Sequence, residues 1–207
     1  MTDHPSYRLS FSYPQGWLQL PVLDNAKALE RDKALESWAE QHARTMLGQR
    51  ASGDTVRQRA AELVRLTVGS RGRQAMYGLA FYPPGAPGLL AILDAKRVVP
   101  DREFPELTFG ALRELYAERT PKTVGDLETS EVELPSGPAL RVRGKSLDEP
   151  DEQEQGLVME RVIHAIRPPY QPDAVVATMT WTALQLGDKL AEMADAIVRT
   201  IRVTPAR

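Results

Sequence analysis

Residues 173–203, near the end of the chain, restrict the fold more than any other segment. Residues 174–182 are an unbroken run of alanine, valine, threonine, methionine and tryptophan, so a strand here has no charge on either face. Residues 186–198 follow with leucine, methionine and isoleucine at helical spacing, and residues 201–203 return to an extended pattern. A strand that is uncharged on both sides needs a sheet covered on both faces, and the helix that follows is a natural cover.

The remaining pattern predicts strands and helices joined by short turns. Alternation predicts a β-hairpin at the N-terminus, with strands at residues 7–13 and 17–20 around the turn Pro14-Gln15-Gly16. Two helices, two strands, a helix and three strands are expected next, at residues 35–47, 56–67, 75–82, 89–99, 105–116, 127–134, 139–146 and 157–167. Short turns favour antiparallel pairing, and helices grouped between sheet segments indicate the α+β class.

The chain has 207 residues, no cysteine and a formal net charge of −2. This length fits one domain, and we expect residues 1–207 to form it, with residues 1–6 and 204–207 flexible. The lack of cysteine excludes disulfides, thiolate catalysis and cysteine zinc sites. The charge balance favours neither nucleic acid nor an anionic membrane as a partner.

The hydropathy pattern gives an expectation for the compartment. Residues 1–6 are polar and do not resemble the apolar centre of a secretory signal. No run approaches the roughly 18 apolar residues that a membrane-spanning helix needs. We therefore predict a cytoplasmic protein that does not bind a membrane.

Both ends of the chain resemble one known superfamily. Residues 11–17, Phe-Ser-Tyr-Pro-Gln-Gly-Trp, are similar to the hairpin that opens Mog1/PsbP-like domains, and residues 177–181 and 197–203 resemble the segments that close them. The resemblance implies an α/β/α sandwich, in which helices flank a mainly antiparallel central sheet. Members are mostly non-enzymatic, and many are bacterial proteins of unknown role, which this chain looks like. They share no set of functional residues, so the resemblance implies no site residue here.

Histidine is the best candidate for acid–base chemistry in this sequence. His42 shares an apolar helix face with Trp38, which is typical of a structural histidine. His164 shares a predicted strand face with Glu160, but residues four apart on a strand are separated by about 13 Å. Glu160 therefore cannot orient His164 directly, although a neighbouring strand could supply another partner. No two histidines have metal-ligand spacing, so we predict neither a metal nor a cofactor.

Other catalytic and ligand-binding motifs are missing. No G-x-S-x-G motif is present, and Ser136 lies in a predicted hairpin turn, where serine serves local hydrogen bonding. The glycines of residues 69–72 lack the G-K-[ST] ending of a phosphate loop. The acidic segment 148–154 lacks the spacing of a calcium-binding loop. The sequence therefore predicts a protein that is not an enzyme.

Two groups of residues form a candidate surface for a protein partner. An arginine-rich helix contains Arg57, Arg59 and Arg65. The preferred interpretation of these arginines is a solvated helix face, and the alternative is a binding site for an acidic partner protein. Tyr82 and Tyr170 adjoin proline-rich turns, where an exposed aromatic ring can anchor a partner. Either ring could equally pack over the end of the sheet.

Three functions remain as hypotheses. The first is a non-catalytic interaction or accessory module with a protein partner. The second is a small-ligand carrier or sensor, with a cavity between sheet and helices lined by Trp17, Trp38 or Trp181. The third is an enzyme that uses His164 with Glu160.

Overall fold

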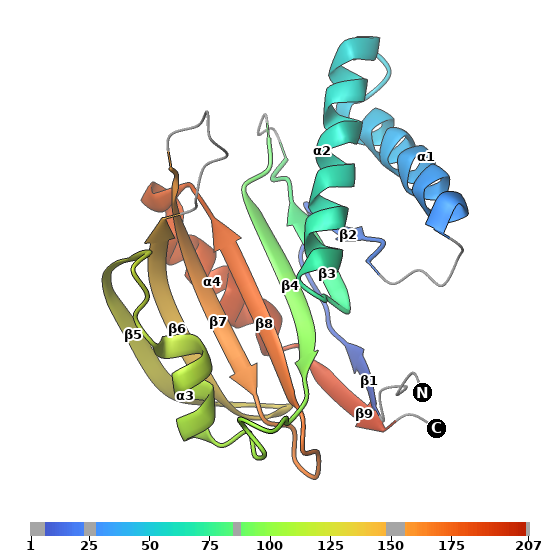
Figure 1. Cartoon of the computed structure of the whole chain (residues 1–207). Coiled ribbons are helices and arrows are strands. Elements are labelled where there is room, and N and C mark those ends of the chain that lie inside the picture. The colour runs from blue at the N-terminus through green and yellow to red at the C-terminus, as the bar shows by residue number, and fades with distance from the viewer. Residues whose placement is uncertain (1–6, 23–27, 85–87, 148–155, 206–207) are drawn as a thin grey trace.

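Seven antiparallel strands form the central sheet of the computed structural model (Figure 1). The structure describes residues 7–22, 28–84, 88–147 and 156–205. In their order across the sheet, the strands are β2 (Trp17–Leu20), β3 (Tyr77–Phe81), β4 (Ala91–Val98), β8 (Ala174–Trp181), β7 (Val158–Ile166), β6 (Gly137–Leu147) and β5 (Thr123–Leu134).

Strand β8 occupies the centre of this sheet. On one side it pairs with β4, and on the other with β7, so that Met179 lies opposite both Leu93 and Val162. The strands β2–β4 and β5–β7 form two meanders, and β8 joins them. The uncharged strand predicted from the sequence is therefore β8, which has a neighbouring strand at each edge and is covered on both faces.

Helices cover both faces of the sheet. They are α1 (Ala28–Leu47), α2 (Gly53–Gly72), α3 (Phe109–Ala117) and α4 (Gly187–Val198), the last preceded by the short turn η1 (Leu184–Leu186). Figure 1 shows α3 in front of the sheet and α4 behind it, with α2 and α1 at the β2–β3 end. The predicted α+β class, with helices flanking a mainly antiparallel sheet, is confirmed.

Two apolar layers hold the helices on the sheet. The layer under α4 contains Trp17, Leu79, Leu93, Met179, Trp181, Leu190 and Ile197. The layer under α3 contains Leu112, Leu140, Val142, Ile163 and Val176. Burial of these side chains stabilises the fold by removing apolar surface from water, at about 25 cal/mol per Å².

The first two strands are present, but they pair differently from the predicted hairpin. Strand β1 (Tyr7–Ser10) pairs with β9 (Arg202–Pro205), and the two form a separate small sheet. Strand β2 instead pairs with β3. The chain between β1 and β2 turns away at Ser12, whose amide nitrogen donates a hydrogen bond to the Thr200 hydroxyl, 2.8 Å away. This contact and burial of Leu9 against Ile201 hold β1 beside the end of α4.

The structure defines where helices α2 and α3 begin. Ser52 is the N-cap of α2, because its side chain accepts a hydrogen bond from the Thr55 amide. Helix α3 begins at Phe109 with Thr108 as its N-cap, so Pro105 precedes the helix and does not lie in its first turn.

Some predictions fall on residues outside the described part of the chain. These are the acidic segment 148–154, which was not expected to bind calcium, and the flexibility expected of residues 1–6, 206 and 207. Thr204 and Pro205, also expected to be flexible, belong to β9 and pair with Arg8 and Tyr7. Within the described residues, no helix combines the length and apolar character required to cross a bilayer.

Candidate functional site

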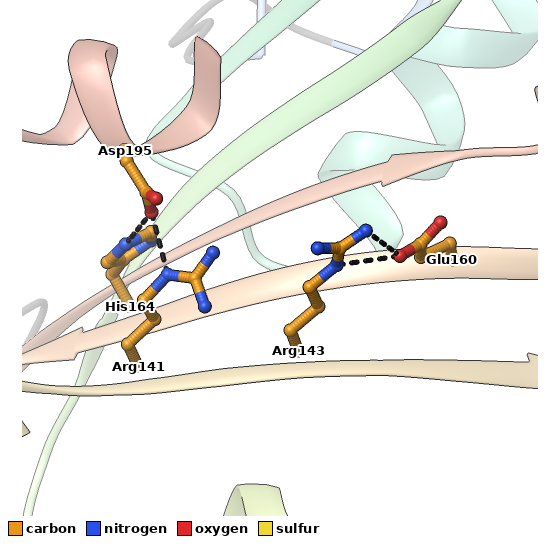
Figure 2. A network of polar contacts seen from close by, with 5 residues as sticks. All are labelled: Arg141, Arg143, Glu160, His164 and Asp195. Carbon is orange, nitrogen blue, oxygen red and sulfur yellow. Dashed lines mark hydrogen bonds and ion pairs between the residues drawn. The ribbon is translucent and has the colours of Figure 1, made fainter. Parts of the chain in front are cut away.

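A network of charged side chains lies between α4 and the strands β6 and β7 (Figure 2). Arg141 and Arg143 lie two residues apart on β6, and Glu160 and His164 lie four residues apart on β7. Because side chains at alternate positions share a face of a strand, all four point to the α4 side. Asp195 approaches them from α4.

Asp195 forms one half of this network. Its Oδ1 accepts hydrogen bonds from Nε of Arg141 and from Nε2 of His164, both at 2.8 Å. Burial alone raises the pKa of this carboxyl, but the hydrogen bonds and the nearby charges of His164 and Arg141 prevail and lower it to about 2. The carboxylate thus stays ionised and fixes both side chains.

The buried position of His164 limits what this pair can do chemically. The side chain is 2% exposed, and its Nδ1 is buried with no hydrogen-bond partner in the described part of the chain. A general base must reach the proton that it abstracts. With Nε2 held by Asp195 and Nδ1 enclosed, neither ring nitrogen of His164 is open to a substrate within the described residues.

Glu160 forms the other half of the network. The Arg143 guanidinium donates to its Oε1 at 2.7 Å, and Nε1 of Trp181 donates to its Oε2 at 3.3 Å. Arg143 also reaches Asp188 at 2.8 Å. A Cβ atom at Gly187 would overlap Glu160, so glycine at the first position of α4 lets the carboxylate approach the helix N-terminus. That end of a helix favours negative charge.

Acidification is expected to weaken the fold through Asp195. Because its pKa is about 2 in the folded chain against an ordinary 3.8, the stabilisation is complete above about pH 4 and is lost as the pH falls towards 2. The loss should be on the order of 1–2 kcal/mol. Urea denaturation between about pH 6 and pH 2 measures it. The Asp195→Asn variant should show a shallower decline, and a decline parallel to that of the unaltered chain would contradict the assignment.

Sequence reasoning found part of this network. It placed His164 and Glu160 on one strand face and excluded a direct contact between them, and the structure agrees. A neighbouring strand was considered as a source of another partner for His164, but the partner, Asp195, comes from a helix. Arg141 and Arg143 were missed, although arginines at alternating positions within an apolar strand are a signal for buried ion pairs.

The two candidate tyrosines have different surroundings. Tyr82 is half-buried, with the Arg59 guanidinium 4.7 Å above its ring, and Arg59 is paired with Glu62 at 2.8 Å. Burial and the Glu62 charge raise the pKa of Tyr82 to about 12. Tyr170 is 100% exposed. Of the two, Tyr170 therefore has a solvent-exposed ring, whereas Tyr82 packs against α2.

A groove runs between α1 and α2 and has a volume of about 900 Å³. Its lining combines small apolar residues with charged ones: Ala60, Ala61, Val64, Gln58, Glu36, Glu40, Arg57 and Arg65. Arg57 and Arg65, both predicted as partner residues, lie on this groove, whereas Arg59 faces Tyr82. The structure thus divides the predicted arginine surface between two places on α2.

The three tryptophans do not surround one cavity. Trp17 and Trp181 belong to the apolar layer under α4, where Trp17 stacks on Phe81. Trp38 lies on α1 and packs with Leu20 on the other face of the sheet. A ligand cavity lined by Trp17, Trp38 or Trp181 stays a prediction. In the described residues, no cluster of three or more histidine, aspartate or glutamate side chains could hold a metal ion.

Comparisons with known proteins leave the family open. No family model matches the chain, and no curated protein matches it. Among solved structures, the chain is similar to LpqN of Mycobacterium tuberculosis, a protein described as involved in cell envelope biogenesis. The match covers 99% of this chain and 88% of LpqN, at 13% identity and a TM-score of 0.45. This likeness is too weak to support an assignment, so the Mog1/PsbP-like resemblance stays a prediction.

Proposed function

We propose that the chain is a non-catalytic protein-interaction module whose partner binds the groove between α1 and α2. The observation that supports this proposal is the position of these helices. Figure 1 shows α1 on the outer side of α2, at the edge of the sheet. The groove between them exposes apolar surface that the rest of the described chain does not cover.

The groove has the chemistry of a helix-binding site. Its apolar residues Ala60, Ala61 and Val64 are flanked by acidic residues from α1 and by arginines from α2. Glu36 and Arg65 form no ion pair with other described residues, so both remain available to a partner. The occupant that fits is an amphipathic helix of another protein, with basic residues facing α1 and acidic residues facing α2.

The charged network under α4 supports a non-catalytic role. Asp195 binds Arg141 and His164, Glu160 binds Arg143, and the remaining ring nitrogen of His164 is enclosed in the described part of the chain. Groups engaged in this way position α4 on the sheet.

Changes in the groove should release the partner without unfolding the chain. Ala61 and Arg65 are exposed, so Ala61→Arg and Arg65→Glu should fold normally. Affinity purification from a lysate of the source organism, with mass spectrometry, should recover a protein with the unaltered chain and about tenfold less of it with either variant. Arg102→Glu, a charge reversal in the β4–α3 connection, is the matched control and should recover as much as the unaltered chain.

Two results would contradict the proposal. One is recovery of the same proteins, in the same amounts, by the unaltered chain and by both groove variants. The other is a dimer in sedimentation velocity that Ala61→Arg dissociates, because the occupant would then be a second copy of the chain.

A further inference from the structure

In the turn between β7 and β8, the exposure and the backbone conformation of Tyr170 do not contribute to the stability of the fold. Tyr170 is fully exposed, and its φ of +66° lies in the left-handed region, which disfavours residues other than glycine. Prolines at 168, 169 and 172 and a hydrogen bond from the Arg167 amide to the Pro138 carbonyl, at 2.9 Å, hold the turn. A strained, exposed aromatic residue on a rigid turn is a common feature of binding sites.

A pocket of about 340 Å³ lies beside Tyr170. It is formed by the β5–β6 turn, the β7–β8 turn and β9, and most of its lining is apolar: Pro135, Pro168, Pro169, Tyr170 and Val203. Ser136 also lines it, is 6% exposed, and has a buried hydroxyl with no hydrogen-bond partner among the described residues. An apolar pocket with a single unsatisfied donor is typical of a site that receives one side chain and one carbonyl group.

Strand β9 adds a backbone edge to this pocket. It pairs with β1 on one side and, in the described part of the chain, with no other strand. Arg202, Val203 and Thr204 line the pocket, so the β7–β8 turn lies next to β9 (Figure 1). An unpaired strand edge can accept another strand through its backbone N–H and C=O groups.

The pocket also favours one sign of charge. Arg202 is the charged residue in the lining, and its Nη1 is fixed by the carbonyl oxygens of Arg199 and Ile201, at 3.0 and 2.9 Å. A fixed guanidinium pairs well with a carboxylate.

We propose that β9 and the adjoining pocket bind an extended, acidic segment of another polypeptide. The segment pairs with the free edge of β9, and one bulky apolar side chain enters the pocket beneath Tyr170. A peptide carbonyl accepts the Ser136 hydroxyl hydrogen, and a carboxylate pairs with Arg202. This site is separate from the α1–α2 groove and takes a strand where the groove takes a helix.

Selection from a phage-displayed library of short random peptides tests this site on the purified chain. Enriched peptides should contain a large apolar residue close to an aspartate or glutamate. Their affinity, measured by fluorescence anisotropy with a fluorescein label, should fall at least about tenfold in Tyr170→Gly and in Arg202→Glu. Glycine suits the backbone at position 170, so the melting temperature of Tyr170→Gly should equal or exceed that of the unaltered chain.

Two further arms distinguish strand pairing from other modes of binding. Methylation of alternate backbone amides should abolish binding of a selected peptide, because strand pairing needs its N–H groups. Ala61→Arg, in the groove, should bind the peptides normally, so failure of one site leaves the other testable. Peptides without acidic residues, equal binding by Tyr170→Gly, or full binding of the methylated peptide would each overturn the proposal.

Discussion

Replacing Glu160 with alanine is expected to lower the free energy of unfolding by about 3 kcal/mol. The side chain is 4% exposed and accepts hydrogen bonds from both Arg143 and Trp181. Its removal takes one partner from the Arg143 guanidinium and leaves the buried indole N–H of Trp181 without its acceptor, and an unpaired buried polar group is costly. Urea denaturation followed by far-ultraviolet circular dichroism measures the change.

Asp188 provides the matched control for Glu160. It binds the same Arg143 at 2.8 Å, but its side chain is 89% exposed. An exposed ion pair contributes about 0–1 kcal/mol, so Asp188→Ala should change stability by less than about 0.5 kcal/mol. If Glu160→Ala and Asp188→Ala lowered the free energy of unfolding by the same amount, burial would not determine how much these contacts contribute to stability.

Replacing Gly137 with alanine should lower the free energy of unfolding by a similar amount, about 3–4 kcal/mol, because the added methyl group has no room. Gly137 has a φ of +125°, and a Cβ atom there would overlap the carbonyl oxygen of Arg167. The variant must therefore strain its backbone and push the β5–β6 and β7–β8 turns apart. Thermal and urea denaturation of the purified variant measure the loss.

Gly125 separates the two causes of that loss. It also has a positive φ, of +72°, but apart from its chain neighbours no described residue has an atom within 4 Å of the place of its Cβ. Gly125→Ala should therefore show the backbone cost alone, about 1 kcal/mol. If Gly125→Ala were as destabilising as Gly137→Ala, the contact with Arg167 would not be the cause.

The strands were predictable because their residues alternate or form uncharged runs. The pairing of β1 was not, since local turn residues suggested a hairpin with β2. Its true partner, β9, lies nearly two hundred residues away, and no local pattern in Tyr7–Ser10 indicates this. Periodicity shows which face a residue shares, whereas the choice of partner depends on how the whole chain packs.

The same limit applies to the charged network. The pattern of β7 placed Glu160 and His164 on one face, but Asp195 belongs to a helix about thirty residues later. Its position becomes informative only once α4 is known to cross β6 and β7. The two tyrosines illustrate a related limit. Both adjoin proline-rich turns, so the sequence pattern does not distinguish them, yet Arg59 lies over the ring of Tyr82 whereas Tyr170 is fully exposed.

The order of strands in the main sheet also sets an order of events during synthesis. The meanders β2–β4 and β5–β7 consist of consecutive strands, so each contains its own partners as soon as it has been made. Neither can join the other until the ribosome has released β8, which must enter between β4 and β7. Strand β1 waits longer still, for β9. The first strand to be made is thus among the last to be placed.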